Sequence, residues 1–155
     1  MGSNRTVQVT LLLLRVVTGL LFMLHGGQKL FGWFGGFGAP GGTAPLLSQF
    51  GFAGVLELCG GGAIVLGLIT RPIAFLVCGE MAWAYFQAHL PHGFWPIQNH
   101  GEPAVLFCFI FLFFAANGAG EYSLDAMLFH RGERGHMDHT ERRDPHLPMS
   151  GRAPA

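Results

Sequence analysis

The chain has 155 residues, of which 50% are hydrophobic and only 12% are charged. Soluble domains carry about 25% charged residues, so this composition is typical of a membrane protein. Nine basic and nine acidic residues give a net charge of zero, which leaves no basic footprint for nucleic acid. The three cysteines form no CxxC pair, so we expect neither a disulfide framework nor a cysteine zinc site.

The charged residues are concentrated at the end of the chain. Five of them fall within residues 16–117 and eleven within residues 118–155. The apolar part predicts a membrane-embedded domain over residues 1–130. Residues 131–155 are charged, contain proline and have few apolar side chains, which predicts a disordered tail.

Four apolar stretches are expected to form helices, since a bilayer core about 30 Å thick needs roughly 20 such residues. They cover residues 7–31, 45–69, 72–90 and 102–117, and a short interfacial helix is expected over residues 123–130. The first stretch contains Arg15 and is longer than the apolar region of a signal peptide, so we favour a retained helix over a cleaved one. The sequence therefore predicts an all-α fold, an integral membrane four-helix bundle.

Basic residues in the connections predict the orientation of this bundle. Arg5, Arg71, Arg131 and Arg134 fall on one side of a four-helix topology, whereas the loops on the other side contain no lysine or arginine. Basic loops remain in the cytoplasm in most membrane proteins. We therefore expect both termini, and with them the tail, to be cytoplasmic.

Two opposite charges are expected at the same depth on different helices. Arg15 and Glu80 each lie about 12 Å along a helix that starts at the cytoplasmic side, at about 1.5 Å per residue. Charged side chains at this depth are costly and are candidates for function. We predict a buried Arg15–Glu80 pair, either as a structural salt bridge or as a group that handles protons or substrate.

A second group of polar residues is expected at the outer mouth of the bundle. Its members are candidates for binding a substrate or a quinone: His25, Lys29, Glu57, Gln87, His89 and His92. His25 and Lys29 are four residues apart, so they share a helix face. Imidazole titrates near neutral pH, which makes His25 the leading candidate for exchanging a proton with a ligand. The alternatives are a core histidine at His25, a snorkelling side chain at Lys29 and ordinary loop polarity for the histidines at the rim.

Small residues in the second helix predict close helix packing. Glycine at positions 54, 60–62 and 67 allows two helices to approach closely. The cysteines are expected to be small apolar fillers, and a redox role is the less favoured alternative. His25 and His89 come closest to a pair of haem ligands, but His89 is expected at the surface, so we expect no haem. A metal site formed by His89, His92 and His100 is likewise disfavoured, no flavin site is evident, and the sequence assigns no catalytic residue.

Several motifs resemble those of the DoxX family, in order, over about residues 11–128. They are Arg15…Gly19-Leu20…His25-Gly26-Gly27-Gln28-Lys29-Leu30-Phe31-Gly32, Glu57…Gly60-Gly61…Gly67-Leu68…Thr70-Arg71, His89-Leu90-Pro91-His92-Gly93-Phe94 with Asn99…Gly101-Glu102, and Gly118…Gly120…Ser123-Leu124-Asp125. The resemblance implies a small four-helix protein of the bacterial inner membrane. Members of this family are linked to quinone-dependent oxidation, as in the membrane part of thiosulfate:quinone oxidoreductase, to oxidative-stress complexes, and to quinone or catechol detoxification.

Two functions are consistent with these patterns, and the sequence leaves open whether the chain is itself an enzyme. The first is a quinone-interacting subunit of a membrane oxidoreductase, or of an oxidative-stress or quinone-detoxification system, with a soluble redox protein as its partner. The second is a non-catalytic membrane scaffold that recruits a soluble redox enzyme. A transporter or channel is less favoured, because four helices are few and no inverted repeat is visible. Membrane lipid is expected to surround the helices. Association of several copies of the chain into a homo-oligomer would enlarge the site.

Overall fold

The computed structural model describes residues 4–128, and every regular element in this range is a helix. The long helices are α1 (Arg5–Phe31), α2 (Gln49–Leu66), α3 (Thr70–Ala84) and α5 (Glu102–Asn117). The short elements are η1 (Trp33–Gly35), the π-helical turn η2 (Tyr85–His89) that continues α3, η3 (Leu90–His92), α4 (Pro96–Asn99) and a last turn over residues 124–128. The predicted tail, residues 131–155, lies outside the described residues, as do the last two positions of the helix predicted over residues 123–130.

The ends of α2 show why this helix is shorter than the predicted stretch of residues 45–69. Ser48 caps its first turn, because the side-chain oxygen accepts a backbone hydrogen bond at 3.1 Å. Its last turn ends at Gly67, whose φ of 67° is left-handed and suits glycine. The helix predicted over residues 102–117 has the same bounds in the structure, and Ser123 caps the short helix that follows it.

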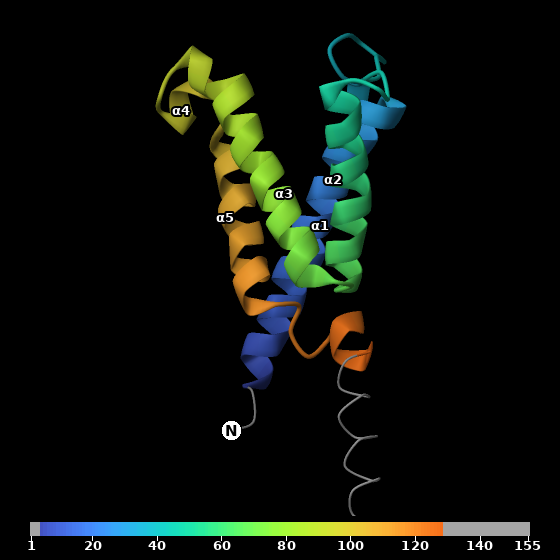
Figure 1. Cartoon of the computed structure of the whole chain (residues 1–155), viewed down its shortest axis with the longest axis vertical. Coiled ribbons are helices and arrows are strands. Elements are labelled where there is room, and N and C mark those ends of the chain that lie inside the picture. Colours follow the sequence, from blue (N-terminus) through green and yellow to red (C-terminus); the bar gives the residue numbers. More distant parts are fainter. Residues whose placement is uncertain (1–3, 129–155) are drawn as a thin grey trace, which may run out of the picture.

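The four long helices form two antiparallel pairs, α1 with α2 and α3 with α5 (Figure 1). Glycines bring α1 and α2 into close contact. A side-chain carbon at Gly26 would lie 2.7 Å from the Gly54 carbonyl oxygen, and one at Gly61 would lie 2.7 Å from the Gly19 carbonyl oxygen. These positions have no room for a larger side chain, which agrees with the close packing predicted for the glycines at 54 and 61.

A common core joins the two pairs. Phe22 of α1 is fully buried, and its ring centroid lies 4.7 Å from that of Phe111 and 5.4 Å from that of Phe107, both on α5. Val77 of α3 and Ile64 of α2 are fully buried in the same cluster. The pairs approach each other around this core and separate toward the end of the molecule at which α4 lies (Figure 1).

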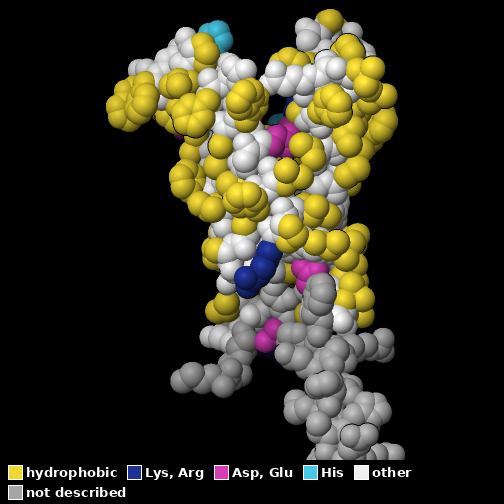
Figure 2. Space-filling view, viewed as in Figure 1, with side chains coloured by type: hydrophobic (Ala, Val, Ile, Leu, Met, Phe, Trp, Pro, Cys, Tyr) yellow, Lys and Arg dark blue, Asp and Glu magenta, His cyan; other side chains and the backbone are white. Residues whose placement is uncertain are grey.

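The outer surface of the helices is strongly apolar. Large hydrophobic side chains cover much of the face shown in Figure 2. Leu13 of α1, Phe75 of α3 and Phe109 of α5 are 59%, 72% and 64% exposed, and soluble monomers rarely expose apolar surface of this extent. Among the described residues, α1 and α2 are each long and apolar enough to cross a membrane, and α5 is apolar but shorter.

Residues 118–128, here called the closing segment, fold back onto the end of the molecule at which α1 begins (Figure 1). The Glu121 amide donates a hydrogen bond to Gln8 Oε1 at 2.8 Å. The Asp125 carboxylate accepts hydrogen bonds from the amides of Ile69, at 2.6 Å, and Thr70, at 2.9 Å. Because these amides belong to the N-cap residue and the first residue of α3, Asp125 caps this helix from a distant part of the sequence.

Candidate functional site

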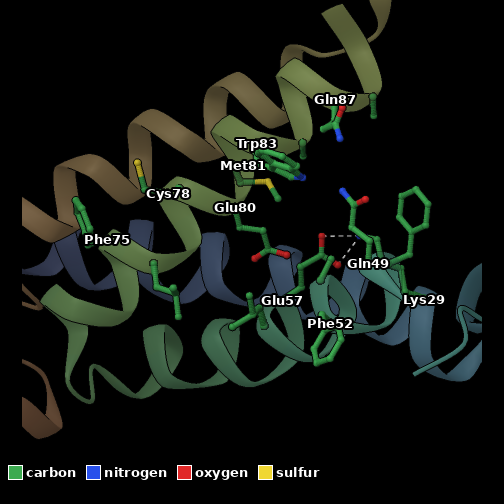
Figure 3. A pocket seen from close by; sticks show the side chains of 17 residues that line it. Lys29, Gln49, Phe52, Glu57, Phe75, Cys78, Glu80, Met81, Trp83 and Gln87 are labelled. Carbon is green, nitrogen blue, oxygen red and sulfur yellow. Dashed lines mark hydrogen bonds and ion pairs between the residues drawn. The ribbon is translucent and has the colours of Figure 1, made fainter. Parts of the chain in front are cut away.

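A cavity of about 720 Å³ lies between α2 and α3, and α1 contributes to its wall. The walls are mostly apolar, with the aromatic side chains Phe52, Phe75 and Trp83 among them (Figure 3). Cavities of about 300–1,000 Å³ with apolar walls and a few polar groups are typical binding sites for small molecules. The polar side chains that line this cavity are therefore the candidates for ligand contacts: Lys29, Gln49, Glu57, Glu80 and Gln87.

The helical period explains why these side chains meet. Gln49, Ala53 and Glu57 follow each other at intervals of four residues, so they lie on one face of α2. Glu80 and Gln87 are seven residues apart and lie on one face of the α3–η2 segment. These two faces border the same cavity, and the close contact of α1 with α2 adds Lys29 to it.

Lys29 of α1 and Glu57 of α2 form an ion pair at the cavity wall. The Lys29 Nζ lies 2.5 Å from each carboxylate oxygen of Glu57, and the two side chains are 16% and 4% exposed. A charge is tolerated in an apolar interior when an opposite charge and hydrogen bonds satisfy it. The ammonium group has three N–H donors, so one of them stays available to a ligand.

Glu80 is the second carboxylate of the cavity, and among residues 4–128 it has no hydrogen-bond partner. Both of its oxygens are buried. Figure 3 shows the carboxylate directed into the space that Glu57 also borders. A buried carboxylate without a partner is costly, so a proton or a ligand with a hydrogen-bond donor would stabilise this side chain.

Arg15 does not pair with Glu80, and that prediction is wrong. Its Nη1 donates to the Ala119 carbonyl at 2.9 Å and its Nη2 to the Tyr122 carbonyl at 2.8 Å, so this guanidinium holds the closing segment. The prediction that Arg15 and Glu80 lie at the same depth assumed that α1 and α3 start at the same level. In the structure α1 extends beyond the start of α3 (Figure 1), and Arg15 packs beside Gly67 in the turn between α2 and α3.

The three histidines predicted for the site do not line the cavity. His25 is exposed and places its ring against Phe107 of α5, with 5.9 Å between centroids. The His89 Nδ1 lies 3.0 Å from the Asn99 carbonyl oxygen, so this ring supports the loop after η2. His92 is exposed in η3. The structure therefore brings together only the lysine, glutamate and glutamine of the predicted outer group.

Gln49 and Glu80 are the polar residues of the cavity that the sequence did not place there. Spacing held a signal for both, since Gln49 shares a face with Glu57, and Glu80 shares one with Gln87. Among the described residues, no group of three His, Cys, Asp or Glu side chains is arranged to hold a metal ion. The residues that could hold an organic ligand are those of the cavity.

A model of the DoxX family matches residues 10–90, which is more than half of the chain. The chain belongs to the DoxX family. Every residue that lines the cavity falls within the matched range. Membership of this family of membrane proteins agrees with the apolar helices α1 and α2.

Two relatives extend the similarity beyond this range. An uncharacterized protein of Haemophilus influenzae is 41% identical over 123 residues, which cover 75% of this chain and 88% of that protein. A Bacillus subtilis protein named "Putative oxidoreductase CatD" is 27% identical over 140 residues, which cover 86% of this chain and 98% of that protein. No solved structure matches this chain significantly.

Proposed function

We propose that this DoxX protein binds a quinone in the cavity between α2 and α3 and is the quinone-linked subunit of an oxidoreductase or quinone-detoxification system. The observation that carries the proposal is a cavity of about 720 Å³ with aromatic walls and a few polar side chains. A quinone ring is flat and apolar and has carbonyl groups at its edges, so it requires this combination of surfaces. A relative that is named as an oxidoreductase supports a redox role.

Each polar side chain has a distinct part in this proposal. The carboxamides of Gln49 and Gln87 donate hydrogen bonds to the quinone carbonyls, and Lys29 uses the N–H that Glu57 does not occupy. Reduction of a quinone to a hydroquinone consumes two electrons and two protons. Glu80 is placed to exchange one of these protons with the ligand, and a partner protein or a second substrate supplies the electrons.

We further propose that four helical segments cross the bacterial inner membrane. The α3–η2 segment is continuous over residues 70–89, and α5 is about 24 Å long at about 1.5 Å per residue. Both ends of the described chain lie at the same end of the molecule (Figure 1), which supports an even number of crossings. Arg5 and Arg71 at that end favour its placement in the cytoplasm, with the cavity in the outer half of the membrane.

Tryptophan fluorescence tests quinone binding, because Trp83 lines the cavity and Trp33 and Trp95 do not. Two variants are purified in mild detergent, one that keeps only Trp83 and one that keeps only Trp95, with phenylalanine at the other two positions. We expect a short-chain ubiquinone to quench Trp83 saturably. Trp95 should be quenched only in proportion to the quinone concentration.

A variant with a filled cavity is the matched control. Gly79 lines the cavity, and a side-chain carbon added there would meet no atom within 4 Å. Gly79→Leu is therefore expected to keep the fold and to abolish the saturable quenching of Trp83. Quenching of Trp83 that stays linear, as for Trp95, would count against quinone binding and would favour the non-catalytic scaffold.

A further inference from the structure

Two cysteines meet between α3 and α5, away from the polar group of the cavity. The Cys78 Sγ lies 3.6 Å from the Cys108 Sγ, and both residues are half-buried. Cys59, the third cysteine, is exposed on α2. The sequence favoured apolar fillers over a redox role, because 30 residues separate Cys78 from Cys108 and spacing alone does not align their helix faces.

The two sulfurs of this pair lie near each other but are not bonded. A disulfide requires a sulfur–sulfur distance of about 2 Å, so the two sulfurs must approach by about 1.5 Å. Small side-chain rotations supply a movement of this size, and α3 and α5 are already packed against each other. Cys78 and Cys108 are therefore neighbours across the α3–α5 contact whose sulfurs need only a short approach to become bonded.

The pair also borders the cavity. Cys78 is one of the cavity-lining residues, and Figure 3 shows its side chain on the α3 wall, directed toward α5. Cys108 lies beside it on α5. A ligand in the cavity therefore lies beside the residue that carries the first sulfur, and the second sulfur lies 3.6 Å from the first.

We propose that Cys78 and Cys108 are a dithiol–disulfide couple that is oxidised by a quinone bound in the cavity. The two thiols lose two protons and two electrons as the S–S bond forms. The quinone takes up both and becomes a hydroquinone, so atoms and electrons balance without another oxidant. The quinone step rests on the proposed function, whereas the ability of the pair to form a disulfide does not.

Three single serine variants, each of which leaves two cysteines, test the couple. Cys59→Ser keeps the proposed pair, while Cys78→Ser and Cys108→Ser are matched controls that each break it. Each protein is exposed either to diamide, which oxidises thiols without needing the cavity, or to a short-chain ubiquinone. Free thiols are then counted by maleimide labelling, and intermolecular products are identified on a non-reducing gel.

We expect Cys59→Ser to lose both thiols in either oxidant and to stay monomeric, while the two controls keep theirs. Adding Gly79→Leu to Cys59→Ser should block oxidation by the quinone but not by diamide. A folded Cys59→Ser protein that keeps both thiols in diamide overturns the couple.

Two further results overturn the quinone step and differ in what they mean. If diamide forms the disulfide and the quinone quenches Trp83 but leaves the thiols free, the step is wrong and the proposed function stands. If the quinone neither quenches Trp83 nor oxidises the thiols, both are wrong.

Discussion

The two carboxylates of the cavity, Glu57 and Glu80, are in opposite situations. Lys29 binds both oxygens of Glu57, whereas neither oxygen of Glu80 has a hydrogen-bond partner among residues 4–128. A satisfied buried ion pair is part of the folded structure, and removal of one partner leaves an uncompensated charge. A carboxylate without a partner is instead free to respond to a ligand. Substitutions at these positions should therefore affect stability and binding differently.

Lys29→Met should strongly destabilise the protein, because it leaves the Glu57 carboxylate buried and unpaired. Breaking a buried pair costs about 3–5 kcal/mol, and thermal unfolding in detergent measures the loss. The double variant Lys29→Met/Glu57→Leu removes both charges and should recover most of the stability. A single variant that unfolds at the temperature of the unsubstituted protein would show that the ion pair contributes little.

Glu80→Gln should change ligand preference without loss of stability. The carboxamide is neutral and similar in size, so the cost of a buried unpaired charge disappears. A carboxylate accepts hydrogen bonds from the hydroxyls of a hydroquinone, and such bonds to a charged group are worth about 1.5–3 kcal/mol. We expect the affinity for a short-chain hydroquinone to fall by about tenfold or more, and the affinity for the quinone to fall less.

Quenching of Trp83 measures both affinities in the proposed cavity. Glu102→Gln, at the exposed start of α5, is the matched control and should change neither affinity. If Glu80→Gln lowers the two affinities equally, Glu80 does not distinguish the redox states of the ligand.

The contact between α1 and α2 depends on which glycines face the neighbouring helix. A side-chain carbon at Gly61 would lie 2.7 Å from the Gly19 carbonyl oxygen, whereas one at Gly62 would have its nearest neighbour, in the Met23 side chain, at 3.9 Å. Adjacent residues of one helix therefore have different tolerances. This difference makes the interface testable with identical substitutions.

Gly61→Ala should lower the thermal stability, and Gly62→Ala should leave it unchanged or raise it. Alanine is favoured over glycine inside a helix by about 0.5–1 kcal/mol, and this gain is retained only where space allows. At Gly61 the added methyl group must push α1 and α2 apart. The free-energy cost of this separation exceeds the gain in helix propensity. Equal effects of the two substitutions on the unfolding temperature would contradict the packing described above.

The sequence predicted those features that depend on local pattern. The bounds of α5 follow from the length of its apolar run. The prediction of an Arg15–Glu80 pair was wrong, because a distance measured along α1 does not indicate at what level α3 begins. His25 does not line the cavity with Lys29, because the helix face that the two residues share is wide enough to contact both α2 and α5, and the His25 ring lies against α5. Contacts between helices depend on their relative rotation and offset, which a single sequence does not encode locally.

The two helix pairs are held together at one end of the molecule and separate at the other. Arg15 binds the carbonyls of Ala119 and Tyr122, and Asp125 caps α3, so the closing segment ties α1 to the start of α3. The cavity lies between α2 and α3. If these hydrogen bonds are lost, we therefore expect the closing segment to loosen first and the cavity to be affected only afterwards.

Arg15→Gln should loosen the closing segment, because a shorter neutral side chain cannot reach both carbonyls. Each hydrogen bond from a charged donor contributes about 1.5–3 kcal/mol, so the amides of residues 119–125 should exchange hydrogen markedly faster. Hydrogen exchange measured by mass spectrometry provides the comparison with α5 in the same protein. Arg5→Gln, at the exposed start of α1, is the control and should leave exchange unchanged. Unchanged exchange in Arg15→Gln would mean that other contacts hold the segment.

The contacts of Arg15 can form only late in the synthesis of the protein. Its two acceptors are 104 and 107 residues further along the chain. A ribosome that has delivered α1, α2 and α3 has therefore not yet delivered the groups that satisfy Arg15 or the carboxylate that caps α3. The first helix pair can assemble early through its own glycines, but it must hold an unsatisfied guanidinium until the closing segment emerges. A nascent chain that ends before Ala119 would contain all the long helices and still lack the carbonyl groups that Arg15 binds.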